Sequence, residues 1–313
     1  MRALITGGAG FIGSHIAEAL LFDGNEVAVL DNLISGKREN LPEGVRLFVR
    51  DVRDREAVFD VFESFRPTHV SHQAAQISVS QSVKDPYFDA ETNVLGGLNV
   101  LDAAVKGGVK HFVFASTGGA IYGEVPEDQR AREEWPARPT SPYAAAKASF
   151  EYYLSVYQQQ FGLSYTVLRY GNVYGPRQDP HGEAGVVAIF SRHLLKGEPV
   201  RVYAKERRGD EGGVRDYIYV KDVVAANMLA LEQAVSGIFN VGTGVGRSTM
   251  EVLDAVSAAL GMAPVVEYSG VRPGDLQRSV LDPSKLEKLG WQANVDFADG
   301  IAETALWFKN NQR

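Results

Sequence analysis

Residues 1–31 restrict the possible fold more than any other part of the chain. Arg2 to Thr6 is a compact apolar run, typical of a buried parallel strand, and it leads directly into Gly7-Gly8-Ala9-Gly10-Phe11-Ile12-Gly13. Apolar residues then recur at helical spacing as far as Asp23-Gly24, and a second apolar run, Glu26 to Leu30, ends at Asp31. The pattern predicts a strand, a glycine turn, a helix, a second strand and an acid in succession.

Each part of this unit has a physical role in binding a dinucleotide. Glycines let the backbone approach a pyrophosphate closely, and the N–H groups at the start of a helix point toward it. Asp31 lies 18 positions after Gly13, close to the interval of about 20 at which an acid accepts a hydrogen bond from a ribose hydroxyl. An acid there disfavours a 2′-phosphate, so we expect NAD as the cofactor and not NADP.

The alternation of strand and helix continues to about residue 171, which predicts a doubly wound parallel sheet of the Rossmann type. Further strands are expected at Val45 to Arg50, from Thr68 into Gln73-Ala74-Ala75, at Lys110 to Ser116 and at Ser164 to Arg169. Ligands bind at the carboxyl ends of such strands.

Two positions near strand ends need separate mention. Asp51 follows the third strand, and its carboxylate either reaches an adenine or caps the helix that begins near Asp54; the sequence favours neither. Asn93 is expected to open a helix whose apolar spacing suits packing on a sheet or on a partner helix.

A helix is predicted to begin at Ser141-Pro142 and to end at Gly162, because Ser is a good N-cap, Pro fits the first helical position and Gly ends helices. Tyr143 then lies in the first turn, and Lys147 follows on the same face. A nearby cation lowers the pKa of a phenol, which can then accept a proton from a substrate hydroxyl. The same spacing also occurs on solvated helix faces, so it does not establish a catalytic pair.

The rhythm weakens after Arg169, where a long irregular stretch begins at Asn172 and a charged loop runs from Lys205 to Gly213. Helices return at Thr249 to Leu260 and Asp299 to Lys309. We therefore expect a first domain of residues 1–171 plus about 214–242, and a smaller mixed α/β domain of about 172–213 and 243–313.

Composition excludes several functions. The net charge of -7, without a Lys/Arg block, argues against nucleic acid as a partner, and the absence of cysteine excludes disulfides and thiolate chemistry. No His has a partner at metal-ligand spacing, so no metal is assigned. With no run of 18 apolar residues and no secretory signal, we expect a cytoplasmic protein that does not enter a membrane.

Motifs spread over most of the chain resemble the extended short-chain dehydrogenase/reductase family. Besides the glycine turn and Tyr143-x-x-x-Lys147, they are Leu168 to Pro176, Arg215 to Asp222, Asn240 to Gly244 and Arg272-Pro273-Gly274-Asp275. The chain is most similar to the branch of the family that epimerises UDP-hexoses at carbon 4. The resemblance implies tightly bound NAD, interconversion of UDP-galactose and UDP-glucose through a 4-keto intermediate, a homodimer, and UDP-sugar binding by the second domain.

The resemblance also assigns roles to residues. Tyr143 would deprotonate the 4-hydroxyl, and Lys147 would bind the nicotinamide ribose and keep Tyr143 ionised. Many epimerases have Ser where this chain has Gly118, so Thr117 is expected to contact the 4-oxygen, with Ser116 as the alternative. The residues expected at the cofactor are Gly7, Gly10, Phe11, Ile12, Gly13, Asp31, Asn32, Asp51, Val52, Gln73, Ala74, Ala75, Asn93, Ser116, Tyr143, Lys147 and Tyr170. Those expected at the substrate are Thr117, Tyr143, Asn172, Val200, Val202, Tyr203, Arg215, Arg272, Asp275 and Ser279.

Three alternatives bear on these expectations. Ser279, expected beside the sugar's 2-substituent, is small enough to leave room for an N-acetyl group, so UDP-N-acetylglucosamine is an alternative substrate. UDP-glucuronate is another, since an Arg or Thr near its carboxylate could come from several loops. A 4,6-dehydratase needs an acid pair where this chain has Gly118 and Gly119, and glycine cannot transfer a side-chain proton. A protein that binds NAD without turnover would not need Thr117, Tyr143 and Lys147 together.

Overall fold

The computed structural model describes residues 1–180, 185–271 and 275–311, and the chain divides into two compact units. Unit 1 consists of Met1–Thr117, Ser141–Arg169 and Val224–Phe239. Unit 2 consists of Gly118–Thr140, Tyr170–Val223 and Asn240–Arg313. Compared with the domains expected from the sequence, unit 2 also takes in residues 118–140, and the last segment of unit 1 begins at residue 224.

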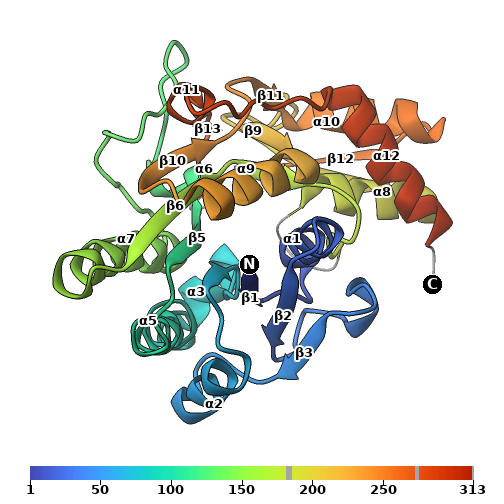
Figure 1. Cartoon of the computed structure of the whole chain (residues 1–313). Coiled ribbons are helices and arrows are strands. Elements are labelled where there is room, and N and C mark those ends of the chain that lie inside the picture. The colour runs from blue at the N-terminus through green and yellow to red at the C-terminus, as the bar shows by residue number, and fades with distance from the viewer. Residues whose placement is uncertain (181–184, 272–274, 312–313) are drawn as a thin grey trace. The chain divides into compact units, whose positions relative to one another are not determined.

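A seven-stranded sheet, with strands in the order β10-β6-β5-β4-β1-β2-β3, forms the centre of unit 1 (Figure 1). Its strands are β1 (Arg2–Thr6), β2 (Glu26–Asp31), β3 (Arg46–Val49), β4 (His69–His72), β5 (His111–Thr117), β6 (Ser164–Tyr170) and β10 (Gly237–Val241). The pairings from β3 through β2, β1 and β4 to β5 are all parallel. The strand order reverses beside β1, as it does in doubly wound sheets, so the predicted fold class is confirmed.

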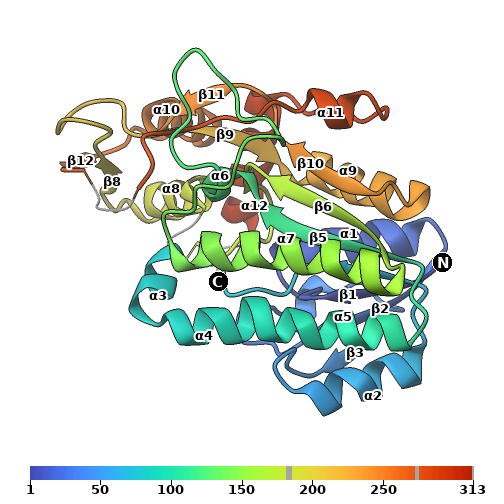
Figure 2. The same cartoon turned by 90° about the vertical axis from the view of Figure 1, so that its left-hand side faces the viewer.

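Helices cover both faces of this sheet (Figures 1 and 2). In both views α2 (Arg55–Phe65), α5 (Gly97–Lys106) and α7 (Pro142–Phe161) lie along one face, and α1 (Phe11–Phe22) and α9 (Val220–Gln233) lie along the other. Strands enclosed in this way have no solvent face, and all seven residues of β5 are buried. This burial explains why the strands read as nearly continuous apolar runs.

The helix that carries Tyr143 has the ends that the sequence predicts. The Ser141 hydroxyl accepts a hydrogen bond from the Ala144 N–H at 3.2 Å, and Pro142 occupies the first helical position. Gly162 ends the helix in the left-handed conformation, with φ of 72°. Local capping chemistry thus fixes where Tyr143 and Lys147 lie on α7.

The expectation that Asn93 opens a helix is wrong. The chain is already helical from α4 (Pro86–Ala90) through a π-helical turn, η2 (Glu91–Gly96), into α5. Asp85 caps α4 by accepting from the Phe88 N–H at 3.0 Å, and Pro86 takes the first helical position. The Asp-Pro pair is therefore the start signal, and Asn93 lies inside the π-helical turn.

Unit 2 contains two small sheets. In the first, β9 (Val214–Tyr219) pairs with β7 (Asn172–Tyr174), β11 (Gly246–Ser248) and β13 (Arg278–Ser279); in the second, β8 (Val200–Tyr203) pairs in parallel with β12 (Val266–Ser269). Its helices are α6 (Gly118–Ile121), α8 (Val186–Lys196), α10 (Thr249–Leu260), α11 (Ser284–Glu287) and α12 (Phe297–Asn310). The two helices predicted late in the chain are therefore present, as α10 and α12.

The stretch after Asn172 is more regular than predicted, because it contains β7, α8 and β8. The residue before α8 is Gly185, which has φ of 100° and forms no side-chain cap, so the helix lacks the usual start signal. One side chain makes several of the hydrogen bonds within the charged loop from Lys205 to Gly213. The Asp210 carboxylate accepts from four backbone N–H groups, those of residues 205, 206, 207 and 212.

Asp216 on β9 is the polar anchor of unit 2. Its buried carboxylate accepts hydrogen bonds from the N–H and hydroxyl of Thr243, from the Gly244 N–H and from the Leu281 N–H. A Cβ atom on Gly242 would lie 2.6 Å from Asp216 Oδ2, so only glycine fits there. The Arg215–Asp222 and Asn240–Gly244 motifs are therefore joined through one carboxylate.

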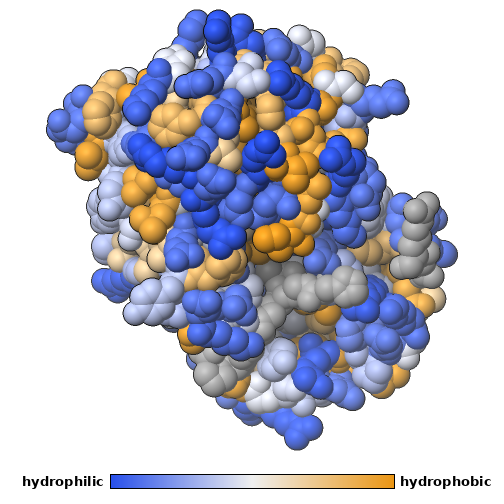
Figure 3. Space-filling view, turned by 90° about the horizontal axis from the view of Figure 1, so that it is seen from below, coloured by the Kyte–Doolittle hydropathy of each residue, from blue (hydrophilic) through white to orange (hydrophobic). Residues whose placement is uncertain are grey.

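None of the helices within the described ranges is both long and apolar enough to cross a membrane. Figure 3 shows one face of the molecule, on which hydrophilic residues cover most of the area and apolar residues lie in groups between them. Two further short helices, η1 (Arg38–Asn40) and α3 (Val79–Lys84), lie in unit 1.

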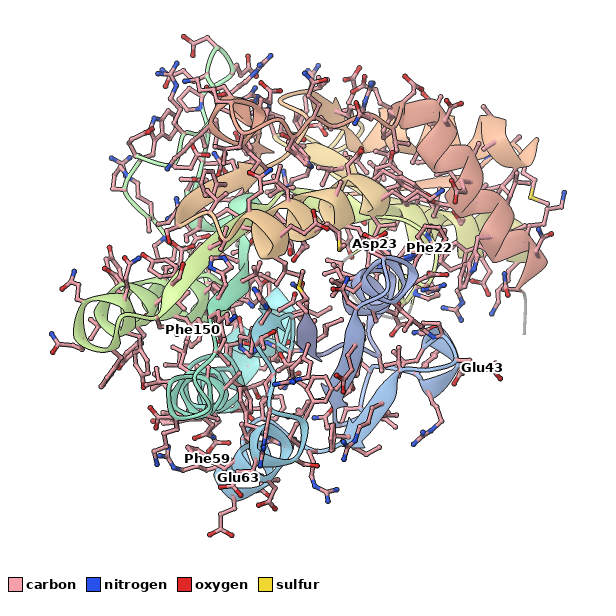
Figure 4. The ribbon with its side chains drawn as sticks, in the orientation of Figure 1. Phe22, Asp23, Glu43, Phe59, Glu63 and Phe150 are labelled. Carbon is pink, nitrogen blue, oxygen red and sulfur yellow. The ribbon has the colours of Figure 1, made fainter. Side chains whose placement is uncertain are left out.

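Phe150 and Phe22 provide a matched test of the core (Figure 4). Phe150 on α7 is fully buried, its ring centre lies 4.6 Å from that of Phe114, and a Cβ atom on Gly97 would come within 2.4 Å of it. Phe22 at the end of α1 is 90% exposed. We expect Phe150→Ala to lower the free energy of unfolding by about 3–5 kcal/mol, because it leaves a cavity.

Phe22→Ala should change the free energy of unfolding by no more than about 0.5 kcal/mol. Urea denaturation of both variants checks this pair. Equal losses of stability would show that the α5–α7 contact is not part of the stabilising core.

Candidate active site

The glycine turn after β1 has the geometry of an anion-binding loop. Gly7 has φ of 68°, and a Cβ atom on it would lie 2.6 Å from the Ala74 nitrogen; a Cβ atom on Gly13 would lie 2.4 Å from the Gly7 carbonyl oxygen. Gly10 is the N-cap of α1 and makes no side-chain hydrogen bond to the helix. The first N–H groups of α1, at Phe11 and Ile12, are therefore left for a ligand, and this start of the helix fits a pyrophosphate.

Asp31 ends β2 and is held by the adjacent loops. Its Oδ2 atom accepts from the Ala9 N–H at 3.0 Å, and its Oδ1 atom accepts from the Leu33 N–H at 2.8 Å. Each carboxylate oxygen has a further lone pair, so this orientation still allows a ribose hydroxyl to donate to it. The residues present fit the adenosine half of NAD.

Asp51 lies beside Asn32 near the end of β3. Its carboxylate accepts from the side chains of Arg53 and Asn32, and these bonds, with the Arg53 charge, lower its pKa to about 2. The cap of α2 is Asp54, whose side chain accepts from the Ala57 N–H at 3.1 Å. Asp54, and not Asp51, therefore caps α2, and contact with an adenine is the other role considered for Asp51.

The loop after β4 contacts β1 and η2 at the carboxyl-terminal ends of the strands. The Ala74 N–H donates to Thr6 Oγ1 at 3.3 Å, and the Gln73 side chain donates to Ser71 and Asn227. The Asn93 side chain accepts from the Gln76 N–H and donates to the Gln76 carbonyl oxygen, both at 3.0 Å. Ala75 lies between these fixed points, and Val52 packs close to Gly96 of η2.

Thr117, Tyr143 and Lys147 come together at the end of β5. The Thr117 hydroxyl lies near enough to the Tyr143 phenol to lower the pKa of that phenol. Lys147 is only 3% exposed; its Nζ atom donates to the Ala115 carbonyl at 2.9 Å and lies 4.8 Å from the ring centre of Phe114. It also lies 6.0 Å from the ring centre of Tyr143. The predicted trio is therefore one cluster in unit 1.

The pKa values of the pair are both shifted by burial. Burial raises the pKa of Tyr143 to about 12, against the hydrogen bond from Thr117, and the Asp89 charge raises it further. Burial lowers the pKa of Lys147 to about 8, against the charges of Asp89 and Glu151. We expected the pKa of Tyr143 to be lowered, but in the protein alone it is raised, because desolvation of the phenolate outweighs its other interactions.

Ser116 is already bound to another group. Its hydroxyl donates to Glu151 Oε1 at 2.5 Å, and Glu151 also accepts from Arg169 Nε at 3.0 Å and Nη2 at 2.6 Å. All three side chains are buried. The alternative role of Ser116 at a substrate oxygen is therefore disfavoured, and Thr117 is the hydroxyl beside Tyr143. Glu151 lies four residues after Lys147 on the same helix, and this spacing could have identified it as a neighbour of the catalytic pair.

A cavity of about 530 Å³ lies within unit 2. Its described lining includes five of the predicted substrate residues or their neighbours, namely Asn172, Arg201, Tyr203, Arg215 and Asp275. Val200 and Val202 do not line it, because they are buried on the other face of β8. Of the β8 residues expected at the substrate, Tyr203 lines this cavity, and its neighbour Arg201 lines it as well.

The cavity carries positive charge suited to an anionic ligand. The Arg215 guanidinium donates to the carbonyl oxygens of Val214, Leu276 and Gln277, and no carboxylate pairs with it in the part of the chain that is described. Arg272, the other predicted diphosphate ligand, lies outside the described residues. This arrangement fits a nucleoside diphosphate.

Three other predicted positions in unit 2 are buried or crowded. Ser279 on β13 donates to the Gly118 carbonyl at 3.4 Å and pairs in register with Arg215. A Cβ atom on Gly119 would lie 3.1 Å from Asn172 Oδ1, so an acid there would press on that amide. Tyr170 is the buried last residue of β6. Over the ranges described, no three His, Asp or Glu side chains gather as metal ligands would.

Comparison with known proteins agrees with this geometry. The model of the NAD dependent epimerase/dehydratase family matches residues 3–242. The chain is 63% identical to a Thermus thermophilus UDP-glucose 4-epimerase solved with NAD, with a TM-score of 0.97 over 99% of this chain and 100% of that one. It is 45% identical to the Thermotoga maritima UDP-glucose 4-epimerase solved with UDP-glucose, with a TM-score of 0.93 over all of both chains.

A third solved structure has a different sugar in its name. It is the UDP-N-acetylglucosamine 4-epimerase of Methanobrevibacter ruminantium, in complex with UDP-N-acetylmuramic acid. The identity is 36% and the TM-score is 0.91, over 99% of both chains.

Proposed function

This chain belongs to the NAD dependent epimerase/dehydratase family, and we propose that it interconverts UDP-galactose and UDP-glucose through a 4-keto intermediate. The observation that carries the proposal is the cluster of Thr117, Tyr143 and Lys147 at the end of β5. The likeness to UDP-glucose 4-epimerases over the whole chain supports the choice of substrate.

Residues of unit 1 would hold the cofactor. The start of α1 would bind the pyrophosphate, Asp31 would accept from the adenosine ribose, and Lys147 would donate to the nicotinamide ribose. NAD, when bound, supplies a hydride acceptor for carbon 4 of the hexose and a positive charge on its nicotinamide ring. Because the hydride returns to the sugar, one bound cofactor serves every turnover.

Three side chains would manage the proton. Tyr143 accepts the proton of the 4-hydroxyl and returns it after the keto sugar has presented its other face. Thr117 holds the phenol oxygen and is placed to hydrogen-bond the 4-oxygen. Lys147 stabilises negative charge on Tyr143, since an ammonium favours a phenolate.

Unit 2 would bind the UDP moiety. We assign the diphosphate to Arg215, whose charge is not balanced by a carboxylate among the described residues, and to Arg272 by resemblance to the family motif. Asn172, Tyr203 and Asp275 line the same cavity and would contact the nucleotide or the hexose.

UDP-N-acetylglucosamine is the second candidate substrate, and the small side chain of Ser279 favours it. UDP-glucuronate would require a cation for its carboxylate. Dehydration is disfavoured, because Gly118 and Gly119 carry no acid and Gly119 lies against Asn172.

A homodimer in the cytoplasm, acting in galactose metabolism, completes the proposal. Apolar side chains on helices of unit 1 support the dimer, because they are exposed on α3, α4, η2 and α7 and a second copy could cover them. We name this set the helical face; its members are Val83, Tyr87, Leu95, Tyr152, Tyr153, Val156 and Phe161.

The first test uses the purified protein and UDP-galactose with no added cofactor. We expect the anomeric protons of UDP-glucose to appear in NMR spectra, since retained NAD would support turnover. With UDP-N-acetylglucosamine in a parallel sample we expect slower epimerisation. Turnover of UDP-galactose with none of the acetylated sugar at saturation would refute the inference from Ser279.

No reaction of UDP-galactose, even after NAD is supplied, would overturn the proposed substrate. UDP-glucuronate and the N-acetylated hexoses would then be measured in the same way.

Tyr143→Phe should lower kcat roughly 10²- to 10⁴-fold, because the proton acceptor is lost. Tyr152→Phe is the matched control, since Tyr152 lies on the same helix and is 72% exposed. Steady-state rates with UDP-galactose measure both variants. Full activity of Tyr143→Phe would remove the mechanism, whether or not NAD stays bound.

Val156→Glu should convert a dimer into a monomer, because a twofold contact would bring two new charges together. Val245→Glu is the control, since Val245 in unit 2 is 47% exposed and Val156 is 48% exposed. Sedimentation velocity measures the mass of each. A wild-type chain that sediments as a monomer contradicts the dimer directly.

A further inference from the structure

Asp89, near the end of α4, is a carboxylate that the proposed reaction has not used. It is 1% exposed. Its Oδ1 atom accepts from Gln76 Nε2 at 2.8 Å and from Asn93 Nδ2 at 3.0 Å. Its Oδ2 atom is also buried and has no hydrogen-bond partner among the described residues. An ionised oxygen in this position is costly unless a positive charge lies nearby.

The nearby positive charge is Lys147. Helix α4, which carries Asp89, packs directly against α7, which carries Tyr143 and Lys147. The Asp89 charge raises the pKa of both Tyr143 and Lys147. Burial raises the pKa of Asp89, and the Lys147 charge opposes that effect without outweighing it. All three groups therefore lie within electrostatic range of one another.

The remaining buried groups around the pair do not supply an unbalanced negative charge. Glu151 on α7 is neutralised by two hydrogen bonds from Arg169 on β6. His72 on β4 bonds to Thr6, and burial lowers its pKa to about 3, so it is uncharged. His111 on β5 is bonded to Ser164 and Thr166, with a pKa lowered by burial to about 4.

Other charged groups on the elements packed against α7 are solvated or paired elsewhere. Lys84 on α3, Glu91 on η2 and Lys106 on α5 are exposed. Asp102 on α5 accepts from Tyr157 and pairs with Arg55. Asp89 is therefore the buried anion near Lys147 that no arginine neutralises, within the part of the chain that is described.

We propose that Asp89 is a positioning residue for this reaction, whose ionised carboxylate serves as the counter-charge of Lys147 and sets the pH range in which the Tyr143–Lys147 pair exchanges a proton. The same carboxylate fixes the Asn93 and Gln76 side chains beside the loop after β4. The inference rests on the proposed function of the Tyr143–Lys147 pair.

The direction of the effect follows from charge. A nearby negative charge raises the pKa of Tyr143 and of Lys147, so removal of the Asp89 charge should lower both pKa values. Both limbs of the pH profile of kcat should therefore move in the same direction. A role confined to packing would lower the rate at every pH and leave the limbs in place.

The test compares Asp89→Asn with Asp102→Asn, which removes a carboxylate of the same unit that is paired away from the cluster. We expect both limbs of the kcat profile of Asp89→Asn to shift down by roughly one pH unit, the size of effect that a nearby charge produces in a buried site. The profile of Asp102→Asn should coincide with that of the wild type. Unshifted limbs in Asp89→Asn would overturn the proposal.

A second readout does not need turnover. The ultraviolet absorbance of the phenolate, taken as the difference between each protein and its Tyr143→Phe counterpart, follows Tyr143 alone. Its midpoint should fall by about one unit in Asp89→Asn and also in Asp89→Ser, which carries the test if the Asn variant does not fold. An unchanged midpoint contradicts the proposal. If the wild type epimerises no UDP-sugar, the proposed function fails, and the titration still decides the role of Asp89.

Discussion

The buried ammonium group of Lys147 is the constraint on which the arrangement of unit 1 depends. Removing such a charge from water costs several kcal/mol unless other groups replace the lost hydration. The Ala115 carbonyl provides one hydrogen bond, and the face of Phe114 provides a cation–π contact of about 0.5–2 kcal/mol. The Asp89 carboxylate on α4 provides compensating charge. Strand β5 and helices α4 and α7 must therefore meet around one nitrogen atom.

This arrangement also explains why the pair cannot act as a base without help. Desolvation holds the Tyr143 proton in place, since it raises the pKa of the phenol to about 12. Tyr143 becomes a proton acceptor only where more positive charge is added beside it. Loss of the Tyr143 proton is in this way linked to the binding of a positively charged group, and in the unliganded protein the phenol stays protonated.

How much could be predicted from the sequence depended on how local the signal was. The strand, glycine turn, helix and acid of residues 1–31, and both ends of α7, follow from neighbouring residues, and they were predicted nearly to the residue. The Glu151–Arg169 pair and the place of Asp89 depend on contacts between elements far apart in the chain, which spacing cannot reveal. The sequence also did not distinguish the two faces of β8, because alternation separates Val202 from Tyr203 without saying which side is buried.

The division of unit 1 among three stretches of chain has a consequence for biosynthesis. Strand β10, the edge neighbour of β6, is made only after more than fifty residues of unit 2, Tyr170–Val223, have followed β6. During translation β6 is thus an unpaired, apolar sheet edge, the kind of surface that recruits other strands. The nascent chain must keep this edge covered until residue 241 has left the ribosome, so unit 1, although it starts first, is completed only after much of unit 2 has been made.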